Sequence, residues 1–343
     1  MNPFNEISTQ SPLSYYVALY KKLEHILKIR RRTIKASKSQ NFNFSLIAQK
    51  YDSRLPSTDQ LSALRNELLN GRETVNNHIF QYWHQGGTFE KAVVAGAPWG
   101  IMHKLSVASI ERYCDDTHVI LDKDTLYNYI DFPHDIMDTL VSMRKYPLLS
   151  DLIRTALLFA HGGTWMDFTL YLLNNIPDKY KNTDLCFFIR EGEFNITSIH
   201  HKDLKHDFLA HSPYYFGWHK DTKVNMLSSY MHATKDNQFL GTLLYIMFDL
   251  VRTENIKSFE YLIYQIATNY LLHREEFKNY YKQLSQYQSD ACCHILQVFD
   301  YVKYDNSIYK ELKEKFPIQK LNAGCRFIKG SLLFETVKKE LGS

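Results

Sequence analysis

The residues best suited to chemistry lie in one short stretch, between Pro147 and Tyr171. Ser150, Asp151 and Arg154 follow one another at spacings that place them on one face of a predicted helix, which Ser150 could cap. Unpaired N–H groups at the start of a helix favour anions, so the carboxylate could bind a ribose hydroxyl and the guanidinium a diphosphate. The alternative is structural: Asp151 would stabilise the helix dipole and pair with Arg154 one turn later.

A second carboxylate follows after two glycines, Gly162 and Gly163, which predict a tight turn from the helix into a strand over residues 164–172. In an unbroken strand, one face would carry Trp165, Asp167, Thr169 and Tyr171. A carboxylate among buried aromatic side chains needs a partner. A divalent cation shared with a diphosphate would be one, since Mg²⁺ takes one or two carboxylates plus phosphate oxygens. The alternative for Asp167 is structural: an ion pair with Arg154, or the capping of a turn.

The surrounding sequence predicts the framework that would position these residues. A β-prone run over residues 78–83, a helix over 102–114 and a strand over 117–121 make a βαβ unit, hence a parallel sheet. Ligands of such sheets bind outside the carboxyl ends of the strands, which directs attention to residues 81–85 and 122–124. Beyond residue 200 the periodicity predicts helices over residues 232–252, 258–272, 275–284, 308–315 and 331–341.

Residues 1–75 are predicted to form a helical, basic extension. Helical periodicity covers residues 13–35, and a second helix over residues 57–70 could be capped by Thr58. Residues 19–38 hold eight Lys or Arg and one Glu, a net charge of +7, which could attach the chain peripherally to an anionic inner-membrane surface. A helix packed on the body of the protein, with a solvated basic end, is the alternative.

The composition of this 343-residue chain argues against several other classes. The net charge is +4, so the chain outside residues 19–38 totals −3 (+4 minus +7), and no basic stripe suited to nucleic acid continues there. Five cysteines without a CxxC pair favour a reducing cytoplasm over a disulfide framework. No apolar run reaches the length of a membrane-spanning helix, so a cytoplasmic location is predicted.

One extended pattern joins these observations. The stretch S-D-x-x-R-x-x-x-L-x-x-x-G-G-x-W-x-D-x-T, from Ser150 to Thr169, resembles the signature of the capsular-polysaccharide-synthesis glycosyltransferases, relatives of the DXD-sugar glycosyltransferases. The run from Phe80 to Gly86 resembles the W-x-Q-G sequence that follows the first strand of this family. The likeness covers about residues 78–175, with a weaker echo at 259–262.

The resemblance implies an α/β fold of the GT-A type, with a Rossmann-like mixed sheet flanked by helices over residues 76–343. Residues 76–175 would form the nucleotide-sugar-binding core, and residues 176–343 the acceptor side and a helical C-terminal part. The implied reaction moves a sugar from a nucleotide-sugar donor, usually UDP- or GDP-linked, to a hydroxyl of a capsular polysaccharide, a lipopolysaccharide or a lipid-linked glycan. Retention of configuration and a divalent cation, Mn²⁺ or Mg²⁺, are also implied.

The resemblance also assigns residues. Asp167 and Arg154 would be catalytic, with Asp167 and Thr169 as metal ligands. The donor would be bound by Gln81, Tyr82, Trp83, Ser150, Asp151, Arg154, Gly162, Gly163 and Trp165. Thr169 stands where the strict DXD pattern has a second acidic residue, and a carboxylate with a hydroxyl is a poorer metal site than two carboxylates. This departure leaves a second hypothesis, a weak or inactive relative that binds glycan or nucleotide as an assembly partner at the membrane.

Overall fold

The computed structural model describes residues 38–85, 97–190, 223–259, 261–298, 302–321, 325 and 327–342. The predicted helix over residues 13–35 lies outside these ranges, as does all of the basic cluster at 19–38 except Lys38.

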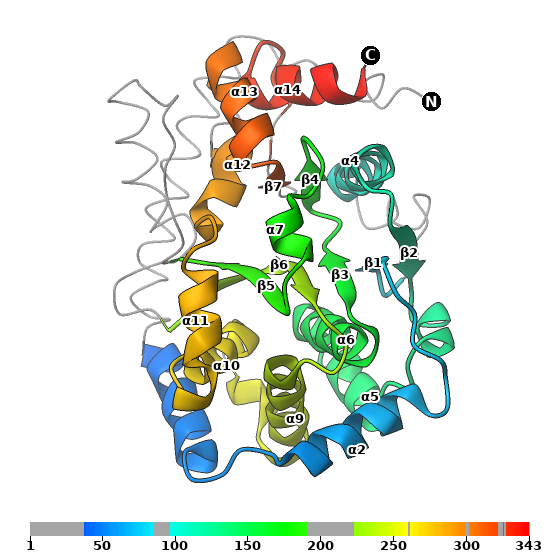
Figure 1. The fold of residues 1–343 in the computed structure, drawn as a ribbon, viewed down its shortest axis with the longest axis vertical. Helices are drawn as coiled ribbons and strands as arrows, with labels where there is room; N and C mark the ends of the chain where they lie inside the picture. The colour runs from blue at the N-terminus through cyan, green and yellow to red at the C-terminus, as the bar shows by residue number, and fades with distance from the viewer. Residues whose placement is uncertain are drawn as a thin grey trace.

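A five-stranded mixed sheet forms the centre of the molecule (Figure 1). Its strands, in spatial order, are β2 (Thr117–Leu121), β1 (His78–Tyr82), β3 (Gly163–Met166), β6 (Met226–Ala233) and β5 (Leu185–Ile189). β2, β1 and β3 are parallel, whereas β6 runs antiparallel to both of its neighbours. The chain passes from β1 to β2 on one side and returns to β3 on the other, so the carboxyl ends of β1 and β3 border a topological switch point. Sheets of this kind bind ligands at such points.

Helices cover the sheet and gather at two ends of the molecule (Figure 1). At one end lie α2 (Thr58–Leu69), α5 (His134–Ser142), α6 (Tyr146–His161), α9 (Gln238–Thr253) and α10 (Ile263–Leu272). At the other end lie α12 (Ile295–Val298), α13 (Asn306–Lys315) and α14 (Leu332–Leu341). The remaining helices are α4 (Ala97–Tyr113), α7 (Asp178–Lys181) and α11 (Lys278–Leu284). The predicted α/β fold, a mixed sheet flanked by helices, is confirmed.

Helix α6 begins earlier than the sequence predicted. Pro147 lies in its first turn, where its missing N–H costs nothing, and Lys145 rather than Ser150 is the N-cap. The buried side chains of Leu148 and Leu149 continue the apolar stripe, so burial extends the helix toward its amino end. Ser150 is therefore well inside the helix, and the free N–H groups of its first turn do not lie beside this residue.

The predicted strand over residues 164–172 is broken in two. β3 ends at Met166, and the Leu170 N–H donates to the Asp167 carbonyl at 2.8 Å, which closes a turn. The chain then forms β4 (Leu170–Leu172), which pairs with β7 (Ile318–Lys320) in a separate two-stranded antiparallel sheet. Trp165 and Asp167 consequently do not share one strand face with Thr169 and Tyr171. An aspartate at the start of a turn is common because its side chain tolerates that geometry.

The predicted helix over residues 232–252 was also wrong at its beginning. Residues 226–233 form β6, which pairs with β3 and β5, and α9 starts only after Asn237, whose side chain accepts the Leu240 N–H at 3.0 Å. Similarly, α10 starts at Ile263, after a 3₁₀ turn over Ile256–Ser258. The helices predicted over residues 275–284, 308–315 and 331–341 are confirmed to within a few residues, the first as a 3₁₀ turn over Glu275–Phe277 that leads into α11.

The helices ahead of residue 75 pack on the main body. Ser57, not Thr58, caps α2, through a capping box with Gln60. Residues 38–51 are helical, and Ile47 and Tyr51 belong to the same hydrophobic core as the sheet. The boundary at residue 75 stays a prediction. Among the described helices, none combines the length and apolar character needed to cross a bilayer, and the five cysteines are free thiols.

Candidate active site

A cavity of about 620 Å³ opens where the carboxyl ends of β1 and β3 meet the start of β6. Tyr82 ends β1 and residues 83–85 follow it, and residues 167–169 follow β3, as expected for a site at the ends of parallel strands. The other walls are formed by Tyr146, Pro147, Ser150, Asp151 and Arg154 of α6, by Val224 and Met226–Ser229, by Tyr261, Leu262 and Gln265, and by His294, Lys320 and Leu321. Pockets of this volume hold small organic ligands.

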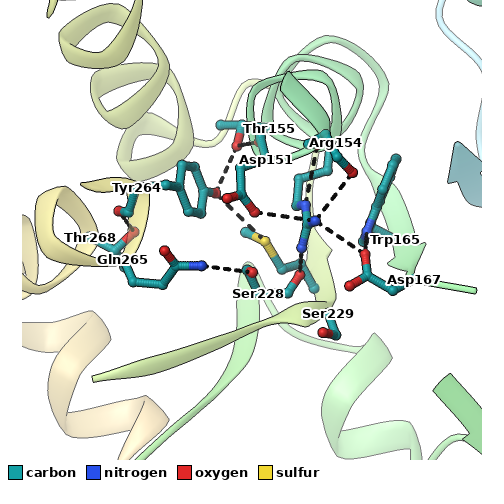
Figure 2. A network of polar contacts seen from close by, with 12 residues as sticks. Asp151, Arg154, Thr155, Trp165, Asp167, Ser228, Ser229, Tyr264, Gln265 and Thr268 are labelled. Carbon is teal, nitrogen blue, oxygen red and sulfur yellow. Dashed lines mark hydrogen bonds and ion pairs between the residues drawn. The ribbon is translucent and has the colours of Figure 1, made fainter. Parts of the chain in front are cut away.

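Arg154 is the central group of the polar network (Figure 2). Its Nη2 lies 3.2 Å from Asp151 Oδ1 and 3.1 Å from Asp167 Oδ1, and its Nη1 donates to the Ser228 carbonyl. The Arg154 side chain is only 4% exposed, and its guanidinium carbon lies 5.0 Å from the centre of the Trp165 ring. Arg154 of α6 and Asp167, which follows β3, therefore meet at one wall of the cavity. Asp151 and Asp167 were each proposed as a partner of Arg154, and it pairs with both simultaneously.

Asp167 is held by three donors. Its Oδ1 accepts from Trp165 Nε1 at 2.8 Å as well as from Arg154, and its Oδ2 lies 3.5 Å from Lys320 Nζ. Lys320 also donates to the Ser229 hydroxyl. The side chains of Asp167 and Lys320 are 23% and 22% exposed, so this ion pair is at the cavity wall rather than in the core.

The two carboxylates differ electrostatically. Burial raises the pKa of Asp151 to about 6, although Arg154 opposes this. Burial would also raise the pKa of Asp167, but Arg154 and Lys320 outweigh it and hold that pKa below its usual value. Asp167 is therefore ionised at neutral pH, whereas Asp151 gains a proton in mildly acidic solution.

Aromatic side chains form the end of the cavity that follows β1. The Tyr82 hydroxyl lies 2.7 Å from His84 Nδ1, and the His84 and Tyr146 rings are 5.3 Å apart between centroids. The Trp83 ring meets the Phe168 ring edge to face at 6.0 Å. Flat aromatic surfaces of this kind can stack on a nucleobase or a sugar ring.

Two buried polar atoms at the cavity walls have no hydrogen-bond partner among the described residues. Gln265 donates from Nε2 to the Ser228 hydroxyl at 3.2 Å, but its Oε1 is unpaired. The Thr169 hydroxyl oxygen is likewise buried and unpaired. A buried polar atom is costly without a partner, and a ligand hydroxyl or amide could supply one at Gln265.

Four residues predicted to bind the donor, Gln81, Gly162, Gly163 and Trp165, are not among the lining residues. Gln81 is fully buried and joins Ser106 to His118 through hydrogen bonds of 3.0 and 2.9 Å. Gly162 and Gly163 have positive φ angles, and an added Cβ would lie 2.6 Å from the Lys235 nitrogen and the His78 carbonyl oxygen, respectively. Their role in the structure is close backbone packing.

Trp165 and residues 122–124 also lie outside the lining. Trp165 does not face the cavity; its ring lies against the Arg154 guanidinium, and its Nε1 donates to Asp167 Oδ1. The Asp122 carboxylate accepts the N–H groups of Asp124 and Thr125 and thereby stabilises a turn. The sequence reasoning missed Lys320, Tyr146, Ser228 and Gln265, whereas His84 lies within residues 81–85, to which it directed attention. Only the echo at residues 259–262 pointed to the α10 wall, where Tyr261 and Leu262 do line the cavity.

The donor set does not fit a divalent cation well. Among the described residues there is no group of three His, Cys, Asp or Glu side chains suited to a metal. Both carboxylates of the cavity are paired with Arg154, and Lys320 faces the remaining Asp167 oxygen. An ion bound at Asp167 would stand beside two cationic side chains. The requirement for Mn²⁺ or Mg²⁺ therefore stays a prediction of the sequence.

The fold and the cavity together define an α/β protein with a cavity at the switch point of its mixed sheet. The chain matches the model of the family described as capsular polysaccharide synthesis protein over residues 23–338, and it belongs to this family. No curated protein matches the chain. Among solved structures, the PaToxG glycosyltransferase aligns with a TM-score of 0.36 and 12% identity, over 84% of this chain and 99% of that chain. A likeness at this level establishes no shared substrate.

Proposed function

We propose that this protein is a glycosyltransferase that takes a sugar from a nucleoside diphosphate sugar, most simply a UDP-sugar, and attaches it to a hydroxyl of a capsular polysaccharide, a lipopolysaccharide or a related glycan. One observation carries the proposal: a single cavity at the sheet's switch point combines aromatic rings at one end with Asp151, Arg154 and Asp167 at its wall. Membership of the capsular polysaccharide synthesis family supports the acceptor class.

The chemistry would break the bond between the anomeric carbon and the diphosphate oxygen. A bond from that carbon to the acceptor oxygen would form, the acceptor proton would pass to solvent, and negative charge would collect on the departing diphosphate. Arg154 is the group best placed to stabilise that charge, because it is buried and held in position by two carboxylates. Retention of configuration stays part of the proposal, and NMR of the product linkage would show an inverted anomer if it is wrong.

The test is transfer by the Asp167→Asn variant. The amide keeps the size of the side chain and removes the charge that positions Arg154, so turnover should fall on the order of 10²–10³-fold. Released nucleotide would be measured with a panel of UDP- and GDP-sugars and glycan acceptors. Asp138→Asn, an exposed carboxylate on α5, is the control and should keep full activity. Transfer at the native rate by Asp167→Asn would show that the site is assigned wrongly.

The second candidate is a weak or inactive relative that binds nucleotide or glycan as an assembly partner at the membrane. Thr169 favours it, because this position carries no carboxylate and its hydroxyl oxygen is buried. Nucleotide binding without turnover across the same acceptor panel would support this candidate. Peripheral attachment through residues 19–38 and a cytoplasmic location stay predictions of the sequence.

A further inference from the structure

Lys320 enters the site from a distant part of the chain. It is the last residue of β7, and β7 pairs with β4, which begins three residues after Asp167. This pairing places Lys320 Nζ 3.5 Å from Asp167 Oδ2, with a further hydrogen bond to the Ser229 hydroxyl. Lys320 lines the same cavity as Arg154, so two cationic side chains approach Asp167 from different elements.

This arrangement leaves little room for an ion at the carboxylate. Mg²⁺ needs oxygen ligands at about 2.1 Å in near-octahedral geometry, and it uses carboxylates that are free to bind it. Asp167 Oδ1 already accepts from Arg154 and Trp165, and its Oδ2 faces the Lys320 ammonium. Asp151 is paired with Arg154 as well. The position at which a cation would neutralise a diphosphate is thus occupied by a side-chain ammonium.

We propose that Lys320, together with Arg154, binds the diphosphate of the donor in place of a divalent cation; this inference rests on the proposed function. An ammonium is a compact positive charge with three donors and suits phosphate oxygens. A diphosphate would compete with Asp167 for both cations, and these charges interact more strongly in a partly buried cavity than in water. Asp151, with its raised pKa, can take up a proton as the anion arrives. Arg154, Lys320, Asp167 and the protonated Asp151 then carry a net positive charge toward the diphosphate.

The experiment measures binding of UDP, with GDP as a second nucleotide, by isothermal titration calorimetry of the full chain. Titrations in EDTA and in Mn²⁺ should give dissociation constants within about threefold of each other (about 0.7 kcal/mol). Lys320→Gln should weaken nucleotide binding in EDTA by about tenfold or more, about 1.4 kcal/mol. Lys320→Arg should recover most of this loss. Binding of uridine, which lacks the diphosphate, should be equal in all variants.

The matched control is Lys181→Gln. Lys181 and Asp116 form an ion pair of the same length, 3.5 Å, with side chains 32% and 24% exposed, away from the cavity. Loss of the Lys181–Asp116 pair should leave nucleotide binding unchanged. The melting temperature of Lys181→Gln gives the stability cost expected for losing such a pair. The titrations of the native protein need no variant, so they test the inference even if Lys320→Gln folds poorly.

The outcomes separate the two proposals. Binding by the native protein in Mn²⁺ but not in EDTA would overturn the inference about Lys320 and leave the proposed function standing. Nucleotide binding by Lys320→Gln at the native affinity would likewise overturn the inference about Lys320 without contradicting the proposed function. Failure to bind either nucleotide in either buffer would instead count against the proposed function, and the inference would fall with it.

Discussion

Asp151 shows how one residue satisfies both interpretations of its sequence position. It pairs with Arg154 one turn later, as the structural alternative predicted, and it also lines the cavity, which is compatible with the functional one; binding of the donor by Asp151 stays a prediction. The pairing holds the guanidinium in place, so a structural contact and a binding role do not compete here. The cost is electrostatic, because a carboxylate is buried beside a second carboxylate, Asp167.

This cost predicts a pH dependence of stability. The pKa of Asp151 is about 6 in the folded protein, above the 3.8 of an unperturbed aspartate, so folding favours the protonated form. Its stabilising contribution is full below pH 4 and is lost as the pH rises through 6. Relative to Asp151→Asn, the native free energy of unfolding should fall by ~2 kcal/mol between pH 4 and pH 7. Urea titrations across this range measure the difference.

The quantity to compare is the change in the free energy of unfolding with pH, not its absolute value, because Asp151→Asn also weakens the contact to Arg154. Asp138→Asn on α5 is an exposed control and should run parallel to the native protein. Parallel curves for Asp151→Asn would contradict the raised pKa.

At the scale of elements, α6 is positioned mainly by its packing against α9. Thirteen of the sixteen residues of α6 are buried, so its register fixes where Asp151 and Arg154 meet the cavity. Gly241 of α9 allows the close approach: a Cβ at this position would lie 2.6 Å from Cε2 of Phe159, a fully buried residue of α6. The glycine is helical, so its use here is to leave space rather than to permit a special backbone angle.

Gly241→Ala should therefore lower the free energy of unfolding by ~1–2 kcal/mol, because overpacking outweighs the better helix propensity of alanine. The same substitution in a Phe159→Leu background should cost less, since the leucine side chain leaves the contacted space open. A coupling of about 1 kcal/mol between the two sites is expected in a double-mutant cycle measured by urea denaturation. Equal costs in both backgrounds would show that the Phe159 ring is not what Gly241 accommodates.

At the scale of the whole molecule, two hydrophobic cores meet along the site. The larger one joins the central sheet to α6, α9 and α10, and the smaller one joins α4, β4, α12, α13 and α14. β4 and β7 contribute to both cores: Leu170, Leu172 and Ile318 belong to the larger one, and Tyr171 belongs to the smaller one. Lys320, the last residue of β7, reaches the cavity from the C-terminal part of the chain. β7, which lies near α12 in Figure 1, thus contributes a positive charge to a site formed mainly by earlier parts of the chain.

Glu340 connects this C-terminal part. Its carboxylate, 1% exposed, accepts from Tyr113 of α4, from Tyr309 and from Lys313, the last at 2.9 Å. Glu340→Ala would leave Lys313 and both hydroxyls without their acceptor, and should destabilise the protein by on the order of 2–3 kcal/mol. Thermal unfolding measures the loss. Glu314→Ala on the exposed side of α13 is the charge-matched control, and a similar loss there would indicate a general effect of charge.

Local sequence patterns were enough to predict the βαβ unit, the helix that ends at Gly162 and the grouping of Asp151, Arg154 and Asp167. These features depend on periodicity and on glycine conformations, which are set by near neighbours in the chain. Three features became visible only in the folded chain: the break in the strand after Met166, the formation of β6 by residues 226–233, and the approach of Lys320 to the cavity. Strand pairing and burial between segments far apart in the chain control those features, and no short window of sequence contains both partners.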